Sequence, residues 1–297
     1  MDEFKIKTFE DYLNYVFVTY KDTITQERKN NPIKQIKIFF RGQSNVDFKL
    51  CPSIARGQIT EHDINTKLQN ERNYITKAKN YYPEIFSNDL LPIDLLAKLQ
   101  HYGVPTRLLD VTSNPLVALY FACKENKCKD GVVYILKKEE EDVDNFPIVQ
   151  GIAESYKFAG THLDYLDDFC KVVMDQSYSL EQKYFIENSC PNDSEKNHWI
   201  NCCCSKPFFV YSKNFFERQL RQCGSFILFH NDIKMDENYR YYFTRMISPM
   251  EDSNECIVEK IIVPCTSKQQ ILNKLDILGI NEMFLFPENV DLLQKNL

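Results

Sequence analysis

The chain has 297 residues, of which 43% are hydrophobic and 13% aromatic, so it can bury a sizeable core. Its formal charge of −6 argues against a protein that holds nucleic acid or a membrane surface by bulk positive charge, although a local basic groove is compatible with that charge. The first residues lack the pattern of a signal peptide, and no run approaches the roughly 18 apolar residues of a membrane span. We therefore expect a cytoplasmic protein that does not enter a membrane.

The eleven cysteines do not indicate a disulfide framework, because their number is odd and the expected compartment is reducing. Cys190, His198 and Cys202 to Cys204 have the residue types of metal ligands. Their spacing lacks the paired C-x2-C that structural zinc sites show. We expect no metal, and interpret the cluster as incidental thiols of a surface insertion.

Apolar periodicity and capping residues predict several helices. Thr8 and Asp11 resemble a capping box ahead of a helix whose apolar side chains share one face. A similar pair, Thr60 and Asp63, predicts a helix that reaches about residue 79. The other predicted helices are residues 89–100, a short helix that begins at Pro115, and residues 267–278.

Short runs rich in Val, Ile and Phe predict strands. The first run, residues 36–40, is followed by Arg41 and Gly42, where a glycine allows the backbone to turn. We therefore expect Arg41 at the end of a strand. The remaining predicted strands are residues 131–136, 225–230, 256–263 and 283–286.

The order of these elements shows no repeat, and strands alternate irregularly with helices. This favours an α+β fold with a mixed or antiparallel sheet body flanked by helices, rather than a doubly wound parallel fold. Residues 137–206 hold a charge run, two glycines and the cysteine cluster, which indicates an irregular inserted lobe. We predict a single domain over residues 1–297, with an N-terminal helix and an insertion at about 137–206.

Polar residues are concentrated between the predicted helices 89–100 and 115–121. Gly103 and Pro105 are residues typical of a helix end, and Asn114 with Pro115 is typical of a helix start. We interpret the segment between them as an exposed loop that holds hydroxyls, a carboxylate, a guanidinium and an imidazole in place. These groups belong to His101, Arg107, Asp110, Thr112 and Ser113.

Three separated motifs resemble the FRG domain, which is named for its Phe-Arg-Gly run. They are Phe40-Arg41-Gly42-Gln43, the segment Gln100 to Cys123, and Arg218-x3-Gln222-x-Gly224-x-Phe226. The similarity continues to about residue 291, so that the core of the domain would cover about 36–291. The family usually has tryptophan where this chain has Val111, so an aromatic wall would be absent there.

The order of these motifs is also similar to that of ADP-ribosyltransferases. The resemblance implies an ADP-ribosyltransferase-like fold and NAD as substrate. It implies that Arg41 pairs with a dinucleotide phosphate or holds a ribose, and that Thr112 and Ser113 hold the ribose on the nicotinamide side. In the third motif, Gln222 would stand where such enzymes have a glutamate that stabilises the oxocarbenium charge. A neutral amide cannot provide that stabilisation, so Asp110 or Glu217 would have to supply the charge.

The residues expected at the site fall into two overlapping groups. Those expected in catalysis are Arg41, His101, Asp110 and Gln222. Those expected to bind the dinucleotide are Arg41, Gly42, Gln43, Arg107, Thr112, Ser113 and Gln222.

Several of these residues also have a purely structural interpretation. Arg41 can bond backbone carbonyls as a buried guanidinium, and Asp110 can form a structural pair with Arg107. His101 can cap a helix, and the hydroxyls of Thr112 and Ser113 can cap the helix that follows. The sequence leaves both sets of roles open.

The resemblance implies an NAD-dependent ADP-ribosyltransferase-like enzyme, of a kind that would suit a toxin or antiviral effector that modifies protein or nucleic acid. One alternative is a noncatalytic sensor that binds a nucleotide or ADP-ribose, and another is a scaffold without a ligand. P-loop, dinucleotide-fingerprint, nucleophile-elbow and zincin motifs do not occur in the chain, so those chemistries have no support.

Overall fold

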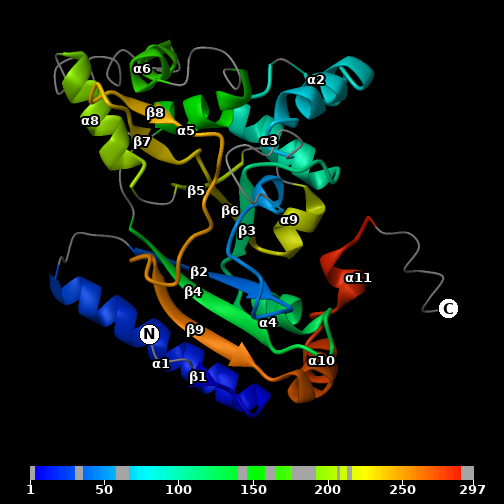
Figure 1. Ribbon diagram of the computed structural model, residues 1–297. Helices are drawn as coiled ribbons and strands as arrows, with labels where there is room; N and C mark the ends of the chain where they lie inside the picture. The colour runs from blue at the N-terminus through cyan, green and yellow to red at the C-terminus, as the bar shows by residue number, and fades with distance from the viewer. Residues whose placement is uncertain are drawn as a thin grey trace.

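The computed structural model describes residues 4–30, 36–57, 67–87, 89–139, 146–157, 165–175, 192–205, 208–212 and 216–288 (Figure 1). The strands are β1 (Phe4–Lys5), β2 (Ile36–Gln43), β3 (Leu108–Thr112), β4 (Gly131–Glu139), β5 (Phe208–Val210), β6 (Gly224–Leu228), β7 (Ile233–Met235), β8 (Tyr241–Phe243) and β9 (Ile257–Val263). The α-helices are α1 (Phe9–Asn30), α2 (Glu71–Tyr81), α3 (Pro92–His101), α4 (Pro115–Cys123), α5 (Phe146–Ala153), α6 (Leu166–Asp175), α8 (Asp193–Cys203), α9 (Glu217–Arg221), α10 (Lys268–Ile277) and α11 (Glu282–Leu285).

A seven-stranded sheet organises the chain, in the order β1-β9-β4-β2-β3-β6-β5. The edge pair β1 and β9 is parallel, and every other pair in this sheet is antiparallel. Strands β7 and β8 form a separate antiparallel hairpin. The predicted mixed, mainly antiparallel sheet flanked by helices is therefore confirmed.

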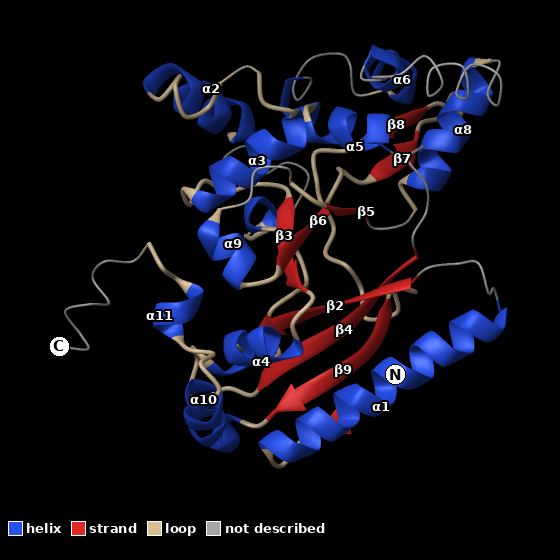
Figure 2. Cartoon of the chain, turned by 180° about the vertical axis from the view of Figure 1, so that it is seen from behind, coloured by secondary structure: helices blue, strands red, loops and turns tan. Residues whose placement is uncertain are grey.

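The sheet splays between β2 and β3. Strand β2 pairs with β4 along its whole length, but its only register pair with β3 joins Phe40 to Thr112. Seen from behind, β3 and β6 turn sharply away from the plane of β2, β4 and β9 (Figure 2). Backbone groups beyond the single pair are left without a strand partner at this junction, which makes room for side chains or a ligand between the two halves.

Helices cover the two halves of the sheet differently. Helices α1, α4 and α10 pack on one face of β2, β4 and β9, through residues such as Tyr12, Ala118 and Leu275. Helices α3, α5, α6 and α8 pack with β3, β5 and β6 into a second core. The two groups of helices lie at opposite ends of the molecule (Figures 1 and 2). None of the helices among the described residues is long and apolar enough to cross a bilayer.

Most of the predicted elements are present. Four predicted helices are confirmed as α1, α3, α4 and α10. Three predicted strands are confirmed as β4, β6 and β9. Asn114 caps α4 as expected, because its Oδ1 accepts a hydrogen bond from the Leu116 amide at 2.9 Å. The predicted Thr60 capping box lies outside the described residues, and so does part of the predicted insertion, whose described parts form α5, α6 and α8.

One strand prediction and one loop prediction are wrong. Residues 283–286 lie mostly in the short helix α11, which Asn281 caps by accepting from the Phe284 amide. The expected polar loop after Gly103 contains β3, whose Leu108, Leu109 and Val111 are buried. A segment of only five residues, two of them polar, carries no clear period, and its pairing with β6 decides its conformation.

The expected turn at Gly42 is also absent, because β2 runs on to Gln43. A Cβ on Gly42 would lie 1.8 Å from the carbonyl oxygen of Ala118 in α4. The glycine is therefore required by the close approach of α4 to the sheet and not by a turn. Arg41 accordingly lies inside a strand, between a core phenylalanine and a packing glycine.

Candidate functional site

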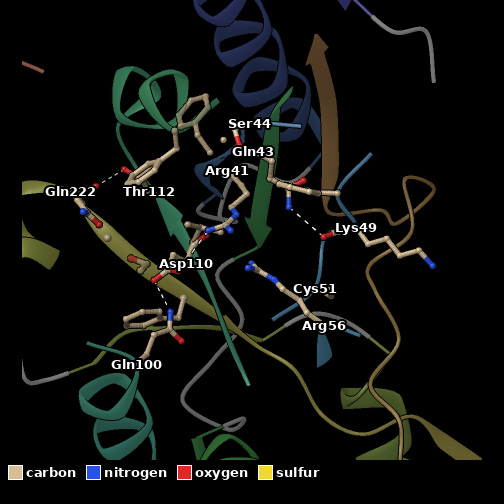
Figure 3. A pocket seen from close by; sticks show the side chains of 18 of the residues that line it. Arg41, Gln43, Ser44, Lys49, Cys51, Arg56, Gln100, Asp110, Thr112 and Gln222 are labelled. Atoms are coloured by element: carbon tan, nitrogen blue, oxygen red, sulfur yellow. Dashed lines mark hydrogen bonds and ion pairs between the residues drawn. The ribbon is translucent and has the colours of Figure 1, made fainter. Parts of the chain in front are cut away.

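A cavity of about 950 Å³ lies where β2 and β3 diverge. Segments that are remote in sequence line it, among them residues between 40 and 57, residues of α3, β3 and α4, residues between 216 and 226, and residues 246–249. Side chains of Arg41, Asp110 and Thr112 come together there from β2 and β3 (Figure 3). Its size is within the range of small-molecule sites.

Arg41 occupies the centre of this cavity. Its Nη1 donates to the backbone carbonyl of Asp110 at 2.8 Å and lies 3.7 Å from the Asp110 carboxylate. Its Nε is buried and has no hydrogen-bond partner. Burial lowers the pKa of the guanidinium, Asp110 opposes that effect, and the nearby cation of Arg56 adds to it. The predicted structural role, bonding a backbone carbonyl, is therefore present, and donor capacity remains for a ligand.

Asp110 is the carboxylate closest to Arg41 among the described residues that line the cavity. Its Oδ1 accepts a hydrogen bond from Gln100 Nε2 at 2.7 Å. The hydroxyl of Thr106 in turn donates a very short hydrogen bond to Gln100 Oε1. This relay fixes the orientation of the carboxylate, while 60% of its side chain stays exposed and open to a ligand.

Arg107 does not line the cavity, and the predicted Asp110–Arg107 pair is wrong. Its guanidinium is 1% exposed and forms a bidentate pair with Glu71, with nitrogen to oxygen distances of 2.7 to 2.9 Å. Its Nη1 donates to Asn231 Oδ1 at 2.7 Å. The side chain points into the core from the start of β3, so it ties α2 and residue 231 to the sheet.

Thr112 and Ser113 differ in whether they line the cavity. The Thr112 hydroxyl donates to the carbonyl of Gln222 at 2.6 Å and accepts from the Asn114 amide at 3.0 Å, so it joins β3 to the third segment. This residue lines the cavity. Ser113 is exposed and is not among the described lining residues, although its amide donates to the Cys223 carbonyl.

Gln222 lines the cavity from the end of α9. Its Nε2 donates to the carbonyl of Leu285 at 3.0 Å, so the side chain also holds α11 against the site. Its backbone carbonyl is the acceptor for Thr112 (Figure 3). The side-chain amide of Gln222 therefore has a structural role in holding α11.

His101 ends α3 at the cavity wall. Its ring stacks on Phe216 with centroids 4.0 Å apart, and its Nε2 lies 3.9 Å from a Glu288 oxygen. Burial lowers the pKa of the imidazole, Glu288 opposes that shift and Arg218 adds to it. The ring is thus biased toward its neutral form, which can accept a proton.

Further cations reach the cavity, and of these the motifs mark only Arg218. Lys49, Arg56, Lys124 and Arg218 line it together with Arg41, against the carboxylates of Asp47, Asp110 and Glu125. The lining is therefore more basic than the whole chain, which carries −6. Single basic residues in loops are usually solvated, so only the folded arrangement distinguishes the other three from the remaining lysines and arginines.

Within the described part of the chain, no group of three or more His, Cys, Asp or Glu side chains could hold a metal ion. The sulfur of Cys202 lies 3.5 Å from His198 Nε2, and Cys190 lies outside the described residues.

Comparison with known families gives one match: residues 36–131 match the model of the FRG domain. The match covers the first two of the three motifs and stops before the third, whereas the resemblance of the sequence to this domain continues to about residue 291. No curated protein and no solved structure matches the chain.

Proposed function

We propose that the FRG domain at residues 36–131 and the segment around Gln222 together form the active site of an NAD-dependent ADP-ribosyltransferase. The observation that carries the proposal is the convergence of three remote motifs on one basic cavity, with Arg41 at its centre. The strands that carry or follow these motifs, β2, β3 and β6, are neighbours in the sheet. This order supports an ADP-ribosyltransferase-like fold as part of the proposal.

The lining residues suit a dissociative transfer. The bond between the ribose C1′ and the nicotinamide nitrogen breaks, and its electron pair leaves with neutral nicotinamide. The Asp110 carboxylate, held by Gln100, would stabilise the resulting oxocarbenium charge. An oxygen or nitrogen nucleophile then bonds to C1′, and neutral His101 would accept its proton. Arg41 would hold the dinucleotide through its free donor capacity.

Nicotinamide release from NAD tests this proposal. We expect Arg41→Ala to reduce release by at least about 100-fold, because it removes the central donor to the dinucleotide while the strand keeps its pairing. Arg72→Ala is the matched control, since Arg72 is an exposed arginine of α2 and does not line the cavity. Unchanged release by Arg41→Ala, with circular dichroism showing both variants folded, would remove the proposal.

The acceptor would be a protein or a nucleic acid, as for a toxin or an antiviral effector that acts in the cytoplasm. Incubation of the protein with biotinylated NAD and a cell lysate, followed by nuclease or protease digestion of the labelled product, would identify the class of acceptor.

One observation favours a second candidate, a noncatalytic sensor of a nucleotide or ADP-ribose. The third position holds a neutral Gln222, whose Nε2 is already engaged with Leu285. Calorimetry separates the two candidates: saturable NAD binding with no nicotinamide released over hours would favour the sensor, and binding of neither NAD nor ADP-ribose would favour a scaffold.

A further inference from the structure

Gln43 presents a buried acceptor to the cavity that the protein does not satisfy. The residue is 5% exposed and lines the cavity one strand position beyond Gly42. Its Nε2 donates to the Lys49 carbonyl at 3.3 Å (Figure 3), but its Oε1 is buried without a partner. Because an unsatisfied buried acceptor lowers stability, a donor supplied by a ligand would be favoured at this oxygen.

Arg41 presents the complementary group two residues earlier on the same strand. Side chains at i and i+2 of a strand lie on one face, at roughly 6 to 7 Å along it. The Nε of Arg41 is buried and unpartnered, like Gln43 Oε1. One face of β2 therefore offers a cationic donor beside a neutral acceptor.

Arg56 brings a second cation to the same place. It extends from the loop that follows β2, and its guanidinium points toward Arg41 and Asp110 (Figure 3). Burial is the main cause of the lowered pKa of the Arg41 guanidinium, and the charge of Arg56 acts in the same direction. Two guanidinium groups that repel one another bind an oxyanion more favourably than either does alone.

We infer that Arg41, Arg56 and Gln43 form a subsite for the phosphorylated ribose of a nucleotide, in which the two guanidinium groups bind the phosphate and Gln43 Oε1 accepts a hydrogen bond from a ribose hydroxyl. This inference deepens the proposed function and rests on it. The phosphodiester oxygens of a dinucleotide carry no proton at neutral pH and only accept hydrogen bonds, so they leave Gln43 Oε1 unsatisfied. A ribose phosphate carries both groups on one small unit.

The inference predicts that two variants change ligand binding in different ways. Gln43→Met, which keeps the length of the side chain, should weaken binding of ribose 5-phosphate about tenfold and change binding of sulfate, an oxyanion without a proton to donate, less than twofold. Arg56→Ala should weaken both ligands about tenfold, because it removes the contact to the oxyanion. Arg72→Ala, remote from the cavity, should change neither. Titration calorimetry of each variant with both ligands measures these ratios.

Three results would overturn the inference. They are an equal loss of both ligands in Gln43→Met, unchanged sulfate binding in Arg56→Ala, and wild-type protein that binds ribose 5-phosphate no more tightly than sulfate. Thermal denaturation shows whether each variant is folded, and if Gln43→Met does not fold, Gln43→Leu takes its place. Failure of the proposed function is distinguishable, because a protein that releases no nicotinamide can still show the difference between the two ligands.

Discussion

Arg41 and Arg107 both lie within residues 36–131, but their hydrogen-bond partners differ. Arg107 is enclosed by Glu71 and Asn231, and each of these contacts is at hydrogen-bond distance. Arg41 has one backbone acceptor, a carboxylate at 3.7 Å and an unpartnered Nε. Buried donors normally have hydrogen-bond partners, so the unpartnered Nε of Arg41 indicates a ligand site. The guanidinium of Arg107, which is bonded to Glu71 and Asn231, indicates a structural role.

The Glu71–Arg107 pair should be important for stability. Glu71→Gln removes the charge that neutralises a guanidinium 1% exposed, so we expect the free energy of unfolding to fall by about 3 to 5 kcal/mol. Urea denaturation measures this loss. The surface variant Arg72→Ala should change stability by less than about 0.5 kcal/mol. A loss below about 1 kcal/mol in Glu71→Gln would show that the pair is not a main tie between α2 and β3.

At the scale of elements, helix α4 sets the geometry of the site. It packs so closely on β2 and β4 that two glycines meet its backbone: the Cβ of an alanine at Gly42 would lie 1.8 Å from the Ala118 carbonyl, and at Gly131 it would lie 2.2 Å from that of Ala122. The close contact fixes β2 against α4, and so fixes the position of Arg41 next to Gly42. The glycine of the Phe-Arg-Gly run thus supports the arginine by packing.

Gly42→Ala should therefore separate α4 from the sheet. The clash involves backbone atoms that cannot move alone, so we expect a loss of at least about 3 kcal/mol in the free energy of unfolding, or failure to fold. Gly224→Ala is the matched control in β6, because its added Cβ would approach the flexible Gln219 Cγ at 3.3 Å. Chemical denaturation of both variants compares them, and equal stability would contradict the close packing of α4.

At the scale of the whole molecule, the splay of the sheet creates the cavity. Helices α1, α4 and α10 hold one half, and the helices around α3 and α5 hold the other. A third buried cluster, which includes Phe39 of β2, Val111 of β3 and Cys256, joins the two halves beside the junction. Lys268 reinforces one side of this junction. Its buried Nζ donates to the carbonyls of Ser44, Glu125 and Asn126 at 2.6 to 3.1 Å, which joins the end of β2 to the loop after α4.

Cysteine reactivity tests the closure of these cores. Burial raises the pKa of the thiols of Cys123 and Cys256 to about 12, so almost no thiolate is present at pH 8.5. We expect iodoacetamide at pH 8.5 to label the exposed Cys128, Cys202 and Cys223 within minutes, and to label Cys123 and Cys256 only after unfolding. Peptide mass spectrometry measures each site. Rapid native labelling of Cys123 would show that the core below α4 is open.

The elements with strong local signals could be predicted from the sequence. The Asn114–Pro115 start of α4 and the apolar runs of β4 and β9 are present because capping and β-branched composition act over a few residues. Strand β3 and helix α11 could not be predicted, since segments of four or five residues have no clear period. The main partner of β3, strand β6, also lies more than 100 residues away along the chain. Arg56 was missed for a similar reason, because nothing local distinguishes it from a solvated arginine.

The sequence by itself determined the fold class, the capped helices and the motif residues that carry Arg41, Asp110 and Gln222, because composition, capping and spacing are local properties of the chain. Only the tertiary structure decided which arginine is enclosed and which remains available, why Gly42 is a glycine, and that the three motifs share one cavity. The physical reason is that hydrogen-bond satisfaction and close packing depend on partners brought together by folding.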